Sequence, residues 1–199
     1  MDKRIINYIL INGRKTHSLG LFHGKAGVAM SMFFYARKTD NKLYYDYARD
    51  LMLDVSRNVC GKGVSVDLEH GLAGIGVALT VYACLFPNEA HDIIEKIAFI
   101  DENVQDRVLH CLEDDTLQDE MKGLKHYMKI RGQSALKHFR GKEKLNVSNQ
   151  FSLTINLKGV SLLSLFKCPL WPVEEYRSHA IDLDGGCSYY VLKECLYGI

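Results

Sequence analysis

The chain has 199 residues, of which 47% are hydrophobic, and this is enough apolar surface for a proper core. Its 25 Lys and Arg residues nearly balance its 24 Asp and Glu residues, and the formal net charge is +1. This balance excludes a global electrostatic attraction to nucleic acid or to an anionic membrane, so we predict neither as a partner.

The amino-terminal segment and the cysteines favour a cytoplasmic protein. The apolar run over residues 5–11 is interrupted by Asn7 and lacks the small-residue cleavage site of a signal peptide. No apolar segment reaches the roughly 18 residues that a membrane span needs. The six cysteines are scattered without a Cys-x-x-Cys pair, so we expect free thiols in a reducing compartment.

A sixteen-residue segment occurs twice, at residues 21–36 and 68–83. Seven of its positions are identical, among them a His-Gly pair and the Ala-Gly pair that follows, and the offset is 47 residues. Repeats of this length are typical of stacked supersecondary units, each of which buries its faces against the next copy.

Each copy predicts an inner helix followed by an outer helix. Residues 28–35 are apolar nearly all round, which is typical of an inner helix, and residues 42–59 place apolar side chains at three- and four-residue steps, as an amphipathic outer helix does. The second copy repeats the pattern, with an inner helix over residues 72–86 and an outer helix after Asn88, which we expect to be its N-cap. The predicted fold class is all-α, built from repeated helix pairs.

Paired glycines stand at the start of both inner helices. An interior glycine costs roughly 1 kcal/mol relative to alanine, so its use at matching places predicts a geometric need. With no side chain, another backbone or a substrate can approach closely. We therefore predict a substrate-binding or close-approach motif formed by Gly24, Ala26, Gly27, Gly71, Ala73 and Gly74.

Both inner helices open with a similar motif, HGKAG at residues 23–27 and HGLAGIG at residues 70–76. This motif resembles the G-x-A-G element of the lanthionine synthetase C-like family, which is often preceded by His-Gly. The resemblance covers residues 19–100. It implies an α/α toroid, in which seven inner helices are ringed by seven outer helices, in a chain roughly twice this length. The present chain then forms part of a ring, which a homo-oligomer, a second half of the toroid or another partner protein would close.

The resemblance also implies a role in the modification of ribosomal peptides. In these enzymes a zinc ion held by two cysteines and a histidine activates a substrate cysteine, which adds to a dehydroamino acid. Their Cys-His-Gly element is absent here, because Phe22 and Glu69 precede the two histidines. Two alternatives follow: a thioether-forming cyclase, or a non-catalytic helical-repeat scaffold that binds a peptide or protein partner.

The remaining candidate site residues are histidines and late cysteines. A neutral imidazole at His23 or His70 can relay a proton or bind a metal, or simply hydrogen-bond a turn carbonyl. Cys187 and Cys195 would lie ~12 Å apart along a helix, too far for one zinc ion with ~2.3 Å bonds. Only a looped segment would let His179 join them in a metal site.

The charge pattern and the change of sequence pattern toward the C-terminus suggest two regions. Residues 101–121 are mainly acidic and residues 122–144 basic, which we interpret as solvated faces of consecutive helices with complementary charges. We divide the chain into a helical-repeat region, residues 1–144, and a C-terminal segment of uncertain structure, residues 145–199. Within the latter, residues 151–157 alternate like a strand, Gly159 could open a decayed repeat, and the double glycine 185–186 predicts a turn.

Overall fold

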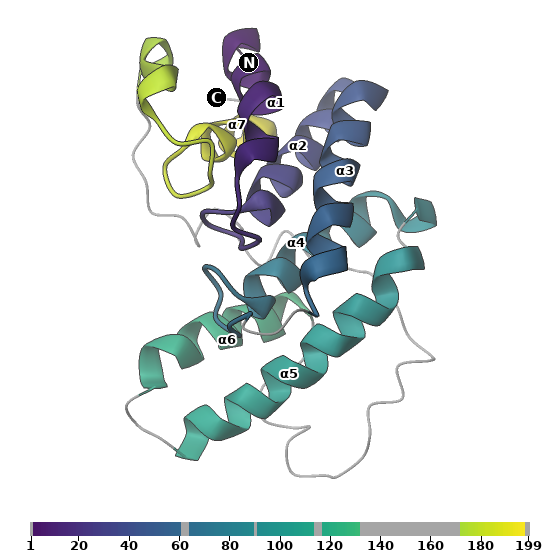
Figure 1. Cartoon of the computed structure of the whole chain (residues 1–199), viewed down its shortest axis with the longest axis vertical. Helices are drawn as coiled ribbons and strands as arrows, with labels where there is room; N and C mark the ends of the chain where they lie inside the picture. Colours follow the sequence, from purple (N-terminus) through teal and green to yellow (C-terminus); the bar gives the residue numbers. More distant parts are fainter. Residues whose placement is uncertain (1, 61–63, 90, 114–116, 132–171, 198–199) are drawn as a thin grey trace.

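The structure is a computed structural model that describes residues 2–60, 64–89, 91–113, 117–131 and 172–197 (Figure 1). These residues form α-helices and short 3₁₀ helices with no strand among them, which confirms the all-α prediction. The predictions for residues 151–157 and for Gly159 lie outside the described residues.

The described α-helices are α1 (Lys3–Asn12), α2 (Lys25–Thr39), α3 (Lys42–Asn58), α4 (Leu72–Leu85), α5 (Ile94–Glu113), α6 (Gln118–Ile130) and α7 (Cys187–Tyr197). The 3₁₀ helices η1 (Gly13–Lys15), η2 (Pro87–Glu89), η3 (His91–Ile93) and η6 (Val173–Ser178) accompany them in the described residues. None of the described helices has both the length and the apolarity needed to cross a membrane.

The inner and outer helices differ in burial as their sequences predict. In α2 every residue from Ala26 to Ala36 is buried, and in α4 every residue from Leu72 to Ala83. Helix α3 buries one face only, and the Asn41 side chain caps it by accepting the Leu43 N–H at 2.9 Å. The helix pair α2 and α3 is therefore an inner helix with its amphipathic outer partner.

The start of α5 differs from the prediction. This helix begins at Ile94, and Asn88 lies instead in the 3₁₀ helix η2. The hydroxyl of Tyr82 donates to the Glu89 carbonyl at 3.1 Å, and Tyr45 donates to the Glu89 carboxylate. These bonds hold η2 against the end of α4, so the chain makes two short 3₁₀ turns before the outer helix can begin.

The inner helices form a row in the order α7, α2, α4, α6, from top to bottom in Figure 1. A leucine from the loop before one helix packs against a glycine of the next. A Cβ atom built on Gly27 would lie 2.8 Å from Leu183 Cδ1, one on Gly74 would lie 2.7 Å from Leu21 Cβ, and one on Gly123 would lie 3.0 Å from Leu68 Cβ. The same contact therefore links each pair of neighbours in the row.

At the α7 end of the row, helices from the N-terminal and C-terminal parts of the chain pack together. Helix α7, near the C-terminus, precedes α2 in space, and α1 packs beside it and beside η6 (Figure 1). The rings of Tyr8 and Tyr176 meet edge to face, with centroids 5.5 Å apart. The described part of the C-terminal segment thus adds another helix pair, α7 with α1, to the repeats of the N-terminal region.

Candidate functional site: the face formed by the opening loops

Three loops of the same length precede α2, α4 and α7 and fold alike. We call residues 18–24, 65–71 and 180–186 the opening loops. In each, the first helical N–H donates to a carbonyl seven residues earlier: Lys25 to Ser18 at 2.9 Å, Leu72 to Ser65 at 2.8 Å and Cys187 to Ala180 at 2.8 Å. The repeat predicted from two sequence copies therefore has a third structural copy.

The third opening loop was missed in the sequence because it lacks the His-Gly pair. A signal was present, since Asp67 and Asp182 both begin an Asp-Leu-x-x-Gly element. Gly185 replaces the histidine and adopts a positive φ of 73°, which favours glycine. The double glycine therefore belongs to a helix opening and not to an isolated turn.

The glycines of the predicted motif let each loop fold back onto its helix. A Cβ atom on Gly27 would lie 1.9 Å from the Leu21 carbonyl oxygen, and one on Gly74 would lie 2.0 Å from that of Leu68. On Gly24 and Gly71 the nearest atoms, Gly20 N and Ser65 O, would be 2.4 Å away. Ala26 and Ala73 are fully buried. In the described residues, backbone atoms of the opening loops fill the space that these missing side chains leave. The motif therefore determines how the opening loops pack on their helices.

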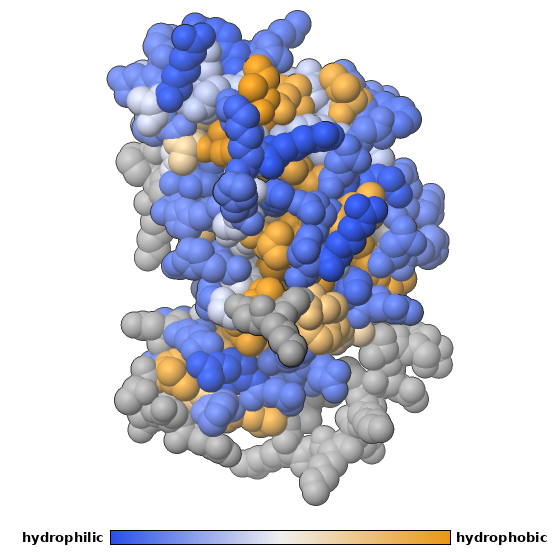
Figure 2. All heavy atoms as spheres, in the orientation of Figure 1, coloured by the Kyte–Doolittle hydropathy of each residue, from blue (hydrophilic) through white to orange (hydrophobic). Residues whose placement is uncertain are grey.

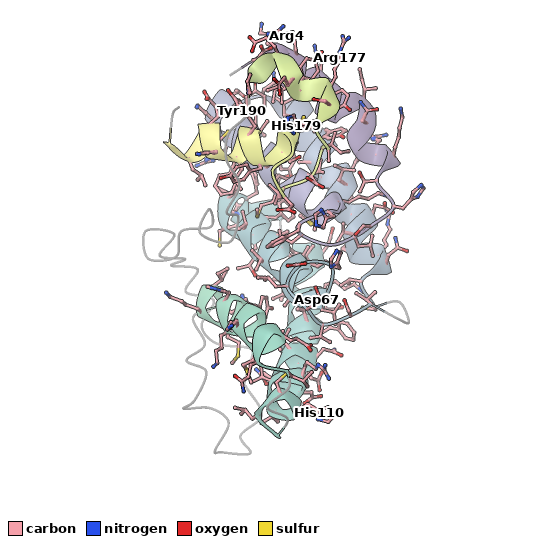
Figure 3. All side chains as sticks on the ribbon, turned by 90° about the vertical axis from the view of Figure 1, so that its left-hand side faces the viewer. Arg4, Asp67, His110, Arg177, His179 and Tyr190 are labelled. Atoms are coloured by element: carbon pink, nitrogen blue, oxygen red, sulfur yellow. The ribbon has the colours of Figure 1, made fainter. Side chains whose placement is uncertain are left out.

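Backbone hydrogen bonds join the three opening loops side by side. The Leu183 N–H donates to the Phe22 carbonyl at 2.8 Å, and the Phe22 N–H donates to the Glu69 carbonyl at 3.0 Å. The loops lie on the left-hand side of Figure 1, which Figure 3 turns toward the viewer; there Asp67 lies below His179 and above His110. We call this surface the loop face.

His23 occupies the centre of the loop face. Its Nδ1 lies 2.9 Å from Asp182 Oδ2, and its Nε2 lies 3.7 Å from Asp184 Oδ2. Because a carboxylate only accepts, the short contact places a proton on Nδ1 and, in the neutral ring, leaves the Nε2 lone pair free to accept. The Asp182 side chain is 16% exposed and that of His23 is 39% exposed, so the acceptor can meet a ligand while its partner is held in place.

His70 joins the same cluster from the second opening loop. Its ring stacks on that of His23, with centroids 5.4 Å apart and an interplanar angle of 29°. Burial acts to raise the pKa of Asp67, but hydrogen bonds from the His70 N–H, the Ser65 hydroxyl and the Glu69 N–H lower that pKa below its usual value. Asp67 Oδ1 lies 3.8 Å from His70 Nδ1. Two imidazoles therefore lie among carboxylates of the second and third opening loops.

The late metal candidates do not come together in the described residues. Cys187 begins α7 and donates its thiol to the Tyr176 carbonyl at 3.4 Å, Cys195 lies two turns later on the same helix, and His179 follows η6. Burial raises the pKa of Cys187 to about 12 and that of Cys195 to about 11, whereas a metal ligand must be a thiolate.

A zinc ion of the kind bound by the resembled enzymes does not fit the described residues. No group of three or more His, Cys, Asp and Glu side chains among them is arranged to hold a metal ion. At the two repeat openings, Phe22 and Glu69 occupy the places where a cysteine would precede the histidine. We therefore assign no zinc ligands to these residues.

Comparison with known proteins identifies the family. The family model described as lanthionine synthetase C-like protein matches residues 3–126, which is more than half of the chain and includes α1 to α5 and most of α6. Among curated proteins and among solved structures nothing matches. Repeated helix openings, inner and outer helices and this match agree: the chain belongs to the lanthionine synthetase C-like family.

Proposed function

We propose that the protein acts in the modification of a ribosomally made peptide in the cytoplasm and that the loop face binds this peptide. Family membership supports the substrate class. The free thiols of the described cysteines Cys60, Cys84, Cys111, Cys187 and Cys195 support a reducing compartment. The observation that carries the proposal is the His23 ring, which Asp182 and His70 hold at the meeting point of three loops.

Thioether formation is the reaction that this arrangement supports best. A peptide thiol bound against His23 would pass its proton to Nε2, and the resulting thiolate would attack the β-carbon of a dehydroalanine or dehydrobutyrine. A C–S bond forms, the electron pair of the C=C bond moves to the α-carbon, and His23 returns the proton there. Asp182 acts as a positioning residue, because its hydrogen bond fixes which nitrogen accepts.

A non-catalytic scaffold is the second candidate. The observation that favours it is the pair of residues before the histidines, because Phe22 and Glu69 cannot supply the thiolate that the resembled enzymes have at an opening. In this case the loop face holds the peptide while a partner enzyme performs the chemistry.

The test uses the full chain and a synthetic peptide that contains one cysteine and one dehydroalanine, with a scrambled sequence as control. Binding is measured by fluorescence anisotropy, and loss of the peptide thiol by alkylation and mass spectrometry. We expect His23→Gln to abolish thiol loss and keep binding within about threefold, with a smaller loss of rate in Asp182→Asn. His110→Gln, on α5 far from the loop face (Figure 3), is the matched control.

The outcomes separate the candidates. Thiol loss that depends on His23 supports the cyclase, and specific binding without thiol loss in the unmodified protein supports the scaffold. Binding no tighter than that of the scrambled peptide would overturn the proposed function.

A further inference from the structure

Two stripes of opposite charge lie at the α6 end of the row. On α5 the exposed carboxylates Glu95, Glu102 and Asp106 follow one face of the helix, at steps of seven and four residues. On α6 the exposed ammonium groups of Lys122, Lys125 and Lys129 do the same, at steps of three and four. We call these sets the acidic stripe and the basic stripe.

In the part of the chain that the structure describes, no ion pair joins the acidic stripe to Lys125 or Lys129 of the basic stripe. Helices α5 and α6 are joined by other residues: Arg107 binds Glu120 at 2.7 Å, and Arg131 binds Asp101 at 2.7 Å. Among the residues that the structure describes, Glu102, Asp106, Lys125 and Lys129 take part in no ion pair. The complementary charges predicted for consecutive helices are thus only partly used between them.

The stripes lie at the α6 end of the described row. Helix α6 is the last inner helix of the described row, with Leu68 packed on its Gly123 from the α4 side. Figure 1 places α5 and α6 together at the end away from α7, and Figure 2 shows this end as mainly hydrophilic with separate hydrophobic patches. Leu109, on the same face as the acidic stripe, is 44% exposed, and Leu112 is 55% exposed.

We propose that a second copy of this chain docks at this end, with the basic stripe of one copy against the acidic stripe of the other. Glu102 and Asp106 are spaced by four residues, as are Lys125 and Lys129, so two pairs ~6 Å apart match along packed helices. A single surface ion pair contributes little, but the repeated pairs fix the register while Leu109 and Leu112 supply apolar area. This association extends the row beyond one chain and does not depend on peptide binding at the loop face.

Charge exchange between the stripes tests the proposal on the full chain. One variant carries Lys125→Glu and Lys129→Glu, a second carries Glu102→Lys and Asp106→Lys, and sedimentation is measured at about 0.05 M and about 0.5 M salt. We expect the unmodified chain to self-associate at low salt, and each variant alone to weaken association at least about tenfold. A mixture of the two variants should associate again.

The matched control is Arg37→Glu with Lys42→Glu, which changes the charge by the same amount as the Lys125→Glu and Lys129→Glu variant, at exposed positions on α2 and α3. This control should associate like the unmodified chain, and circular dichroism checks that all variants remain helical. A monomeric unmodified chain, association that neither stripe variant weakens, or a mixture that stays monomeric would each overturn the proposal.

Discussion

Gly74 illustrates how a single missing side chain fixes the contact between two repeats. A Cβ atom there would lie 2.0 Å from the Leu68 carbonyl oxygen and 2.7 Å from Leu21 Cβ. The Leu68 carbonyl belongs to the backbone and cannot move aside as a flexible side chain would. We therefore expect Gly74→Ala to lower the free energy of unfolding by about 1–3 kcal/mol, the range of overpacked cores. Urea unfolding followed by circular dichroism measures this.

Gly123 provides the control at the next contact of the row. A Cβ atom there would meet Leu68 Cβ at 3.0 Å and the next atom only at 3.8 Å, both less severe than at Gly74. Alanine also favours a helix by up to about 1 kcal/mol relative to glycine, so we expect Gly123→Ala to change stability little. Equal losses in the two variants would contradict the explanation given for Gly74.

The residues of the loop face were only partly predictable. His23 and His70 stand in the duplicated openings, so the sequence identified both as candidates. Asp182 lies 159 positions from His23, and no spacing in the sequence indicates that the two side chains meet. Only the folding of the C-terminal segment onto the first repeat brings them together.

At the scale of elements, α7 joins the row through its opening loop. Leu183 is fully buried, and its side chain fills the space above Gly27. We expect Leu183→Ala to reduce the free energy of unfolding by about 2–5 kcal/mol, because the surrounding backbone cannot collapse onto the cavity. Hydrogen exchange should also accelerate at the Cys187 and Ser188 amides, whose partners lie in this loop.

Leu43→Ala serves as the comparison for this change. Leu43 is 62% exposed on α3, so its truncation should alter stability by less than about 0.5 kcal/mol. If Leu183→Ala proved as mild as Leu43→Ala, or left α7 exchange unchanged, the leucine would not anchor this helix.

The inner helices were predictable to different degrees for a physical reason. At Gly27 and Gly74 a Cβ atom would meet first the carbonyl oxygen of the helix's own opening loop and then a leucine of the loop before it in the row, and both contacts keep the glycine motif visible in the sequence. The equivalent residue of α7 is Tyr189. Because α7 begins the described row, no opening loop of those residues packs on it, so the leucine contact that requires a glycine in α2 and α4 is absent there. The third copy was therefore recognisable from its structure more easily than from its motif.

At the scale of the whole molecule, the order of the row is a property of the folded chain. The sequence repeat predicts that α2 and α4 are neighbours, because they are consecutive copies. It does not predict that α7 precedes α2, since that neighbour comes from the opposite end of the chain. The order follows from the bonds between loops, in which Leu183 donates to Phe22 and Phe22 to Glu69.

The stability of the whole molecule should fall at alkaline pH because of its buried and partly buried thiols. Burial raises the pKa of Cys84 and Cys195 to about 11 and that of Cys187 to about 12, above the ordinary value of 9.0. The folded state keeps these thiols neutral while the unfolded state ionises them. The contribution of these thiols to stability is therefore fully present below about pH 9 and is lost as the pH rises toward 11–12. The loss is at most about 1.4 kcal/mol per pH unit for the buried Cys187, and it is smaller for the partly exposed Cys84 and Cys195, which water screens.

Urea unfolding under reducing conditions between about pH 8 and pH 10 measures this loss. Cys187→Ala removes one group that ionises more readily in the unfolded chain, so the alkaline slope should decrease even if stability at pH 8 is lower. Cys60→Ala is the control, because Cys60 is exposed and meets water in both states. A slope that Cys187→Ala leaves unchanged would mean that this thiol ionises as readily in the folded chain as in the unfolded one, and that the start of α7 is open to solvent.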